Sequence, residues 1–298
     1  MAGMRVLDVD EQGRLLVAVT DGDQVRLVEL AKGRRAELTA ATGLTAAKYL
    51  PGERLVVIQH GDPAQLSLLR VGKRITPLMG STGHATELLG VLPGRIVYRT
   101  NRRHRLLYSI VIRNVLFGEE VAVYDRGGAV IEAAVSPNSR YIAIRLPRKL
   151  VLVDTMPVTE DDHVRLISPE PAERGRRNLR WLPDSARLIA TEYDEDSTRI
   201  VRYDVASESW HPVAVSLPTN STGWVAPDGR RIAIASGTTL MFHQTDNGRF
   251  LRSAELPAPI AEDAFLWSPD SRSVAVSTVT GEIAVVQADS AALTQIPS

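Results

Sequence analysis

The stretch Phe265-Leu-Trp-Ser-Pro-Asp-Ser-Arg-Ser-Val-Ala-Val-Ser277 decides the fold, because versions of it recur along the whole chain. The proline of its turn is Pro269, and five further copies have theirs at Pro51, Pro93, Pro137, Pro183 and Pro227. A seventh copy, Val9-Asp-Glu11-Gln-Gly-Arg14, has glutamate in place of the proline. Successive copies lie 40 to 46 residues apart, and such a period is typical of a solenoid or a propeller.

The pattern inside one unit distinguishes between these architectures. An apolar segment leads into Pro227-Asp-Gly229, where proline presets the first turn angle and the next residues tolerate a tight bend. The alternating run 231–235 follows, and two more apolar runs come after further turn residues. Four short strands per unit, without the 3.6-residue apolar spacing of helices, are typical of a propeller blade. We therefore expect an all-β, seven-bladed β-propeller with four antiparallel strands per blade.

We expect residues 1–298 to form a single domain. The seven blades are predicted at approximately 5–40, 46–79, 88–126, 131–168, 178–216, 222–257 and 264–298. The first blade begins with its own first strand and the last ends in its own fourth strand. No strand is then exchanged as a latch, and closure is predicted to depend on apolar packing between blades one and seven.

The amino-acid composition limits the classes of partner and of site that the protein can have. The 298 residues are 44% hydrophobic, and the 35 basic and 35 acidic residues cancel, which disfavours nucleic acid and an anionic membrane as partners. Cysteine is absent, which excludes disulfides and cysteine-ligated metals. No basic leader and no apolar run of membrane-spanning length is found, so we expect a cytoplasmic protein.

Several segments carry a family resemblance that spans essentially the whole chain. They are Tyr98-Arg-Thr-Asn-Arg-Arg103, Glu132-Ala-Ala-Val-Ser-Pro-Asn-Ser-Arg140, Gln65-Leu-Ser-Leu-Leu69 and the Trp-Ser-Pro-Asp-Ser-Arg of blade seven. Together they resemble the N-terminal propeller of actinobacterial prolyl oligopeptidase-family serine peptidases. The resemblance implies a seven-bladed propeller without an exchanged strand, which in that family caps an α/β-hydrolase domain and filters substrates by size.

The chain departs from that family in the part that performs catalysis. No Gly-x-Ser-x-Gly motif occurs, so neither a triad residue nor peptidase activity is carried over. The repeated turn serines Ser136 and Ser268 are interpreted as turn residues rather than nucleophiles, since no base is paired with them. Trp181 and Trp267 occupy equivalent blade positions, which predicts packing between blades rather than a platform for stacking a ligand.

Three histidines are candidates for acid–base catalysis. His60 and His104 follow the second strands of blades two and three, and His84 lies in the connection between these blades. Both classes of loop share one face of a propeller, so the imidazoles can approach one another. Their sequence spacing is not that of a metal site, and independent surface histidines are the favoured interpretation. No catalytic residue and no metal site is assigned.

The same rim is predicted to collect arginines. Residues 99–105 are interpreted as a basic turn after a strand at 95–98, and residues 168–177 as a polar connection before a strand at 179–182. The candidate ligand-binding residues are Arg102, Arg103, His104, Arg176, Arg177, Asp194 and Asp196. Guanidinium groups bind carboxylates and phosphates in a bidentate manner. Solvated loops with local salt bridges are the favoured alternative.

Two classes of function remain open. The first is a non-catalytic module that binds a small molecule, a peptide or a partner protein, such as a separate hydrolase, at the mouth of the central channel. The second is a propeller enzyme, for instance a cyclase, isomerase or hydrolase of a small metabolite that uses His, Arg and Asp side chains. We favour the first because no catalytic constellation is visible, and we expect no cofactor.

Overall fold

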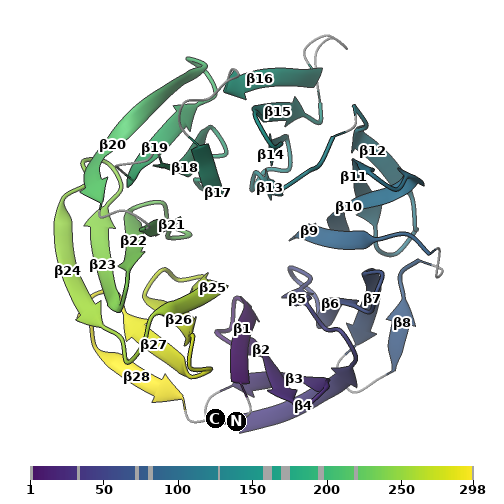
Figure 1. Ribbon diagram of the computed structural model, residues 1–298, viewed down its shortest axis with the longest axis horizontal. Helices are drawn as coiled ribbons and strands as arrows, with labels where there is room; N and C mark the ends of the chain where they lie inside the picture. The colour runs from purple at the N-terminus through teal and green to yellow at the C-terminus, as the bar shows by residue number, and fades with distance from the viewer. Residues whose placement is uncertain are drawn as a thin grey trace. The chain divides into compact units, whose positions relative to one another are not determined.

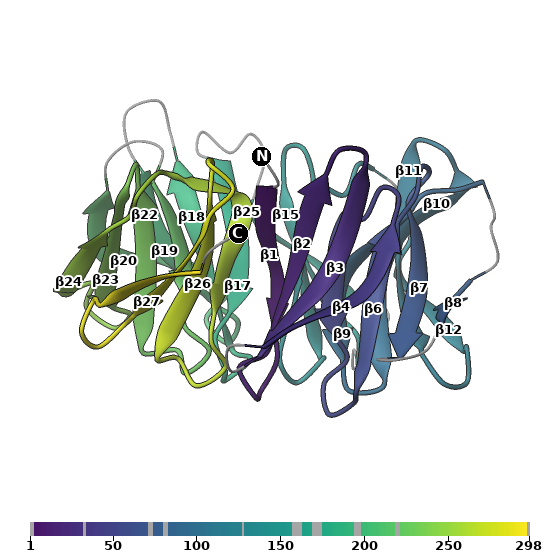
Figure 2. The same cartoon turned by 90° about the horizontal axis from the view of Figure 1, so that it is seen from below.

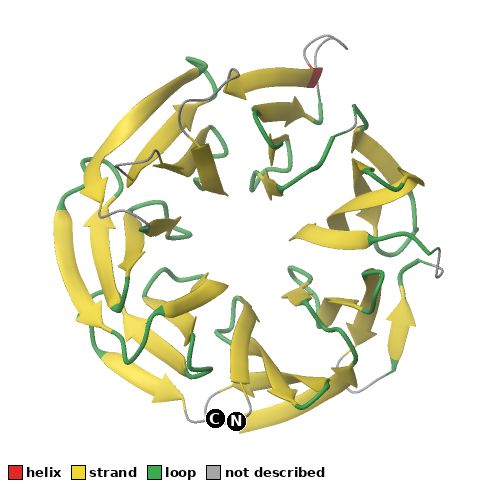
Figure 3. Ribbon diagram, viewed as in Figure 1, coloured by secondary structure: helices red, strands yellow, loops and turns green. Residues whose placement is uncertain are grey.

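The computed structural model describes residues 3–31, 34–70, 74–79, 83–126, 128–156, 163–168, 175–193, 198–217 and 221–296. This part of the chain contains strands β1–β28 and no α-helix; the short red segment before β16 in Figure 3 is a 3₁₀ turn at His163. The strands form seven antiparallel sheets of four consecutive strands each (Figure 1). The predicted fold class, an all-β seven-bladed β-propeller with four antiparallel strands per blade, is confirmed.

The chain divides into two compact units. The first comprises Met1–Gly127 and Ile260–Ser298 and holds blades one, two, three and seven. Blade one consists of β1 (Gly3–Val9), β2 (Leu15–Asp21), β3 (Gln24–Ala31) and β4 (Arg34–Ala41), and blade two of β5 (Ala46–Tyr49), β6 (Leu55–His60), β7 (Gln65–Arg70) and β8 (Ile75–Pro77). Blade three consists of β9 (Thr86–Leu92), β10 (Arg95–His104), β11 (Leu107–Asn114) and β12 (Glu120–Tyr124), and blade seven of β25 (Ile260–Trp267), β26 (Ser273–Thr278), β27 (Ile283–Gln287) and β28 (Leu293–Ile296).

The second unit, Gly128–Pro259, holds blades four, five and six. Blade four consists of β13 (Glu132–Val135), β14 (Tyr141–Arg145), β15 (Leu150–Asp154) and β16 (Val164–Ser168). Blade five consists of β17 (Gly175–Trp181), β18 (Arg187–Tyr193), β19 (Thr198–Asp204) and β20 (Ser209–Leu217). Blade six consists of β21 (Thr222–Val225), β22 (Arg231–Ser236), β23 (Thr239–Gln244) and β24 (Phe250–Glu255).

Strand β6 shows why the sequences of the inner strands are continuous runs of apolar residues. Successive side chains of a strand point to opposite faces, and both faces of this blade are covered by a neighbour. Val56 and Ile58 pack into the core between blades one and two. Val57, on the other face, packs into the core between blades two and three. All three side chains are fully buried, so the core is distributed over the contacts between blades.

The repeated turns are held by their own side chains. In blade seven the Ser268 hydroxyl donates to Asp270 Oδ1 at 2.6 Å and accepts from the backbone N–H of Ser273 at 2.9 Å. Asp270 Oδ1 also accepts from the backbone N–H of Arg272 at 3.0 Å. Ser271 adopts a positive φ of 60°, the conformation that glycine favours. Ser268 and Asp270 therefore stabilise this turn, and Ser136 and Asn138 do the same in blade four.

Closure between blades one and seven uses no exchanged strand, because each blade is built from its own four strands. Apolar side chains fill this contact, namely Met4, Val6, Val17, Ala264, Ala275 and Ile283. The backbone N–H of Met4 donates to the carbonyl oxygen of Gly281 at 2.9 Å, and that of Val6 donates to Ser277 Oγ at 2.8 Å. The predicted unlatched closure by apolar packing is confirmed, and two hydrogen bonds supplement it.

Each blade has two ends, which Figure 2 shows from the side. Because neighbouring strands are antiparallel, the turn between the first and second strands lies at one end of a blade, and the turn between the second and third strands lies at the other. We call these the first-turn end and the second-turn end.

Two predicted loops at the second-turn end are wrong. The basic segment 99–105 belongs mostly to β10, which continues to His104 and pairs there with Leu107. Arg176 and Arg177, expected in a connection, lie in β17 and pair with Glu192 and Thr191. Both segments extend their blades because each finds a neighbouring strand to complete its backbone hydrogen bonds. The sequence contains too few apolar residues at these positions to reveal a strand.

Candidate functional site

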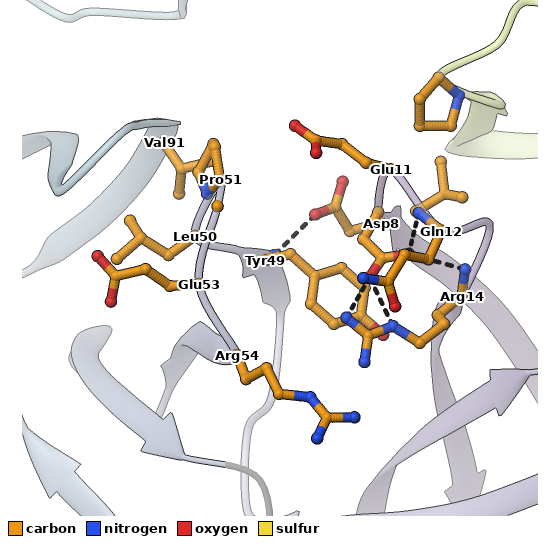
Figure 4. A pocket seen from close by; sticks show the side chains of 14 residues that line it. Asp8, Glu11, Gln12, Arg14, Tyr49, Leu50, Pro51, Glu53, Arg54 and Val91 are labelled. Atoms are coloured by element: carbon orange, nitrogen blue, oxygen red, sulfur yellow. Dashed lines mark hydrogen bonds and ion pairs between the residues drawn. The ribbon is translucent and has the colours of Figure 1, made fainter.

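A pocket of about 380 Å³ opens at the first-turn end of the first unit (Figure 4). This volume lies within the range of about 300–1,000 Å³ that is usual for small-ligand sites. The pocket forms where the first turns of blades one, two and seven approach one another beside strand β9. Its lining consists of Asp8, Val9, Asp10, Glu11, Gln12, Arg14, Tyr49, Leu50, Pro51, Gly52, Glu53, Arg54, Val91 and Pro269. We call it the first-turn pocket.

A β-bulge in β1 sets the direction of Asp8. The register with β2 shifts between Val6 and Asp8, so Leu7 is the additional residue of the bulged strand. A shift of one residue exchanges the two faces of a strand, and the bulge thereby re-aims Asp8. One carboxylate oxygen of Asp8 accepts a hydrogen bond from the backbone N–H of Tyr49 at 2.7 Å (Figure 4). The other oxygen lies 3.9 Å from Lys48 Nζ.

The Asp8 carboxyl group, near the end of strand β1, has an unusual electrostatic environment. Burial raises the pKa of its carboxyl group above the ordinary value, because charge is costly away from water. The nearby Lys48 ammonium and the Tyr49 N–H oppose this rise, and Asp10 adds to it. A carboxyl group with a perturbed pKa beside a pocket is a common property of functional sites.

Arg14 is already neutralised inside the pocket wall. Its Nε donates to Asp10 Oδ2 at 2.6 Å, and its guanidinium carbon lies 5.4 Å from the centre of the Tyr49 ring. The Tyr49 hydroxyl donates to Glu29 Oε2 at 2.8 Å. Burial, together with Glu29, raises the pKa of Tyr49, so the phenol remains a proton donor at neutral pH. These groups build a fixed wall rather than a free binding site.

The other charges of the pocket are less constrained. Among the residues that the structure describes, neither Glu11 nor Glu53 has a side-chain hydrogen bond or an ion pair, and Arg54 also lacks one. The lining contains four carboxylates, from Asp8, Asp10, Glu11 and Glu53, against two guanidinium groups, from Arg14 and Arg54. Four negative and two positive charges leave a formal excess of two negative charges. The pocket is therefore acidic, although the chain as a whole is neutral.

A second pocket, of about 510 Å³, lies at the first-turn end of the second unit, between blades four and five. Its lining consists of Asn138, Arg140, Tyr141, Asp154, Arg165, Asp184, Ser185, Ala186, Val205 and Ala206. Arg140 NH2 pairs with Asp154 Oδ2 at 3.1 Å, and the Arg140 guanidinium carbon lies 5.1 Å from the Tyr141 ring centre. Arg165 forms an ion pair with Glu208. This pocket is wider, and its arginines pair with carboxylates of the chain.

The predicted arginines of blade three are held by carboxylates. Arg102 NH1 lies 2.6 Å from Glu120 Oε2, and Arg103 forms an ion pair with Asp125. Glu120 Oε1 also accepts from Arg113 at 2.7 Å. Burial alone would raise the pKa of Glu120, but the hydrogen bonds from Arg102, Tyr98 and Arg113 outweigh burial and hold this pKa below the ordinary value. The local salt bridges that we favoured from the sequence are therefore present in this blade.

The predicted arginines of blade five are arranged in the same way. Glu192, only 2% exposed, pairs with Arg176 at 2.6 Å and also with Arg199. The Arg176 guanidinium carbon lies 4.3 Å from the Trp210 ring centre, and that of Arg177 lies 4.9 Å from the Tyr193 ring centre. The other two predicted ligands, Asp194 and Asp196, lie outside the described residues. The ligand-binding role of these residues stays a prediction.

The three candidate histidines lie in different surroundings. His60 Nε2 is hydrogen-bonded to Ser67 Oγ at 2.9 Å, whereas His104 Nδ1 accepts from the backbone N–H of Leu106 at 3.3 Å. His84 is exposed in the connection before β9. None of them lines either of the two pockets. In the described ranges, no group of three or more His, Asp or Glu side chains is arranged to hold a metal ion.

The two structural interpretations of repeated residues are confirmed. Ser136 Oγ donates to Asn138 Oδ1 at 2.8 Å and accepts from the Tyr141 N–H at 2.9 Å, which is the turn role that Ser268 plays in blade seven. Trp181 of blade five stacks on Tyr141 of blade four with ring centres 5.9 Å apart, and its Nε1 donates to the Ala134 carbonyl oxygen at 3.0 Å. Trp267 is likewise buried.

Sequence reasoning missed the first-turn pocket. Its signal was present in the repeat alignment, because the first-turn copies of blades one and two contain Glu11 and Glu53, whereas the turn of blade seven uses small residues for its own hydrogen bonds. The bulge that redirects Asp8 has no comparable signal, since it arises from strand register.

Comparisons with known proteins identify the fold and no family. No protein-family model matches the sequence, and no curated protein matches it significantly. An oligogalacturonate lyase in complex with manganese is similar in structure, with a TM-score of 0.78 and 13% identity over 100% of this chain and 91% of that chain. One of two prolyl endopeptidases analysed for inter-domain dynamics gives a TM-score of 0.72 and 12% identity over 99% of this chain and 49% of that chain. TolB from Acinetobacter baumannii gives a TM-score of 0.58 and 16% identity, over 94% of this chain and 77% of that chain. These likenesses show the propeller fold.

The described residues contain no helix that could cross a membrane.

Proposed function

We propose that this chain is a non-catalytic binding module, a propeller of the kind that precedes the hydrolase domain in actinobacterial prolyl oligopeptidase-family peptidases. The likeness to a prolyl endopeptidase, which covers nearly all of this chain and about half of that one, supports this proposal. The sequence segments that resemble this family of propellers support it independently. The module binds a small molecule, a peptide or a partner protein.

One observation carries the proposal, namely the open pocket at the meeting point of turns from three blades. Loops on a rigid scaffold are the usual place for recognition, because they vary without disturbing the core. Glu11 and Glu53 line this opening from two blades, and no described side chain neutralises them. We assign binding to this pocket in preference to the second-turn end, where the candidate arginines Arg102, Arg176 and Arg177 contact carboxylates or aromatic rings.

A second candidate function is a propeller enzyme that acts on a small metabolite. The raised pKa of Asp8 favours it, because a carboxyl group with a raised pKa is better suited to proton transfer than an ordinary carboxylate. The likeness to a lyase shows only that propellers of this form occur among enzymes. Turnover that disappears in Asp8→Asn and persists in the exposed control Asp23→Asn would favour this function over the binding module.

Native mass spectrometry of gently purified protein tests the binding module. We expect additional mass of a few hundred daltons for a metabolite, or of tens of kilodaltons for a partner protein. Gln12→Trp places a large side chain in the pocket lining at an exposed position and should remove the additional mass. Gln24→Trp, at an exposed position in β3, is the matched control.

The outcomes show whether the ligand binds in the first-turn pocket or elsewhere, and whether the protein binds a ligand at all. If the Gln12→Trp variant retains the ligand as well as the Gln24→Trp variant does, the binding site lies elsewhere on the molecule. If the protein carries no additional mass, and cell extract adds none, the binding module is contradicted.

A further inference from the structure

We infer that the first-turn pocket binds an organic cation with an apolar stem, that is, an alkylammonium or alkylguanidinium group such as a lysine or arginine side chain. The inference rests on the proposed binding module and names the class of ligand that its pocket accepts. It follows from three properties of the cavity: its size, its apolar wall and the positions of its charges.

The size suits one extended side chain or a small amine. At about 380 Å³ the pocket is near the lower limit of ligand sites, so it accepts a group of several heavy atoms rather than a folded surface. Its described carboxylates are not grouped closely enough to hold a bare metal ion. A ligand that spans the opening between two turns contacts them more fully than an ion would.

The wall provides a surface for a methylene stem. Leu50, Pro51, Val91 and Pro269 line the cavity from three blades, and Leu50 is almost fully buried. Long cationic side chains place their methylene groups on apolar surface while the charged end remains near water or a carboxylate. The pocket therefore matches both parts of such a group.

The charges favour a cation over an anion. Arg14 is neutralised by Asp10, so the electrostatics at the opening depend on Asp8, Glu11 and Glu53 against Arg54. Glu11 and Glu53 lie on the turns of two neighbouring blades, and both line the pocket (Figure 4). A cation that contacts either carboxylate gains a charge-assisted contact at no cost to an existing ion pair in the described residues. An anion would meet three carboxylates and one guanidinium group.

The test uses a fluorescein-labelled Ala-Ala-Arg-Ala-Ala peptide and fluorescence anisotropy. A peptide with citrulline in place of arginine retains the shape of the side chain without its charge. We expect the arginine peptide to bind at least tenfold more tightly than the citrulline peptide, with an affinity that falls as salt increases. Free agmatine as competitor separates the two sources of the cation, because equal affinity per guanidinium group indicates a small amine and weaker affinity indicates a peptide.

Variants of the lining supply the internal controls. Glu11→Gln and Glu53→Gln should each weaken binding of the arginine peptide about three- to tenfold. Arg54→Gln, at an exposed position between the same turns, should strengthen binding by a few fold, because it removes a like charge. Gln12→Trp should abolish binding, and Gln24→Trp should leave it unchanged. Circular dichroism and melting temperature confirm that each variant is folded.

The outcomes distinguish this inference from the proposed function. If the arginine and citrulline peptides bind equally and Gln12→Trp abolishes both, the pocket is a binding site but not a cation site, and the inference is overturned alone. The same holds if Mn²⁺ binds and is displaced by neither peptide. If neither peptide binds, the inference is overturned, while co-purified mass that depends on Gln12 would still support the binding module.

Discussion

The two ends of the blades use charge in opposite ways. At the second-turn end, two of the candidate arginines are held by carboxylates, Arg102 by Glu120 and Arg176 by Glu192. At the first-turn pocket, Glu11 and Glu53 lack such partners among the described residues. The density of charge in a sequence therefore does not locate a binding site. A site requires charge that the fold leaves without an internal partner.

Glu192→Gln gives the largest expected effect and tests whether the second-turn end of blade five is structural. It leaves the guanidinium groups of Arg176 and Arg199 without their buried carboxylate, and we expect the free energy of unfolding to fall by about 3 kcal/mol. Urea denaturation followed by circular dichroism measures the change. A loss below about 1 kcal/mol would mean that these arginines do not depend on Glu192 and remain available to a ligand.

Glu120→Gln should have a smaller effect that depends on pH. The pKa of Glu120 is lower in the folded protein, so its stabilising contribution is present above the ordinary pKa of glutamate and is lost as pH falls through the lowered value. At pH 7 we expect a loss of about 1–2 kcal/mol, reduced by the partial exposure of Arg102. In urea titrations, the stabilities of the variant and the unmodified protein should converge as pH falls below the lowered pKa of Glu120. A constant difference across this range would contradict the ion pair as the cause.

Asp8→Asn, at the first-turn pocket, should increase the stability of the folded protein at neutral pH, whereas the two glutamate variants decrease it. The pKa of Asp8 is raised by burial, so ionisation of this group costs stability as pH rises through the raised pKa. Asparagine can still accept the hydrogen bond from the Tyr49 N–H. We expect equal stability at low pH and a gain of up to about 1 kcal/mol at pH 7, measured by urea denaturation. The exposed Asp23→Asn is the control, and a loss at pH 7 would show that Lys48 outweighs burial.

Arg103→Ala gives the smallest expected effect. The Arg103 side chain is 61% exposed and its ion pair with Asp125 is screened by solvent, so the melting temperature should change by less than a degree or two. The sequence-based hypothesis assigns Arg103 to an anionic ligand. Binding of inorganic phosphate, measured by calorimetry and lost in this variant, would restore the second-turn end as a site and would weaken the contrast between the ends.

The sequence was sufficient for the fold because the signal is repeated. The turn that contains Ser268 and Asp270 folds through hydrogen bonds among its own residues, so each copy can be identified from local sequence. The strand ends were less predictable. Arg176 and Arg177 extend β17 because β18 lies beside them, and a polar segment contains no sign of that neighbour.

The site depended on information that is not local. Asp8 approaches Tyr49 of the next blade because of a bulge in β1, and the pocket closes only where turns from three blades meet. Likewise, Arg102 is neutralised by Glu120, which follows it by 18 residues in another strand. Sequence analysis identified the charged residues, but only their partners decide which of them are available.

The unlatched closure between blades one and seven has a consequence for how the gene could be rearranged. Each sheet is made from one continuous segment, and the first and last strands, β1 and β28, both contribute side chains to the core between blades one and seven (Figure 1). A circular permutant with the two ends joined and a new start in the connection between β4 and β5 would keep every sheet intact. Such a permutant would separate the two halves of the first-turn pocket in sequence while leaving them adjacent in space. Folding would then not depend on which blade comes first in the sequence.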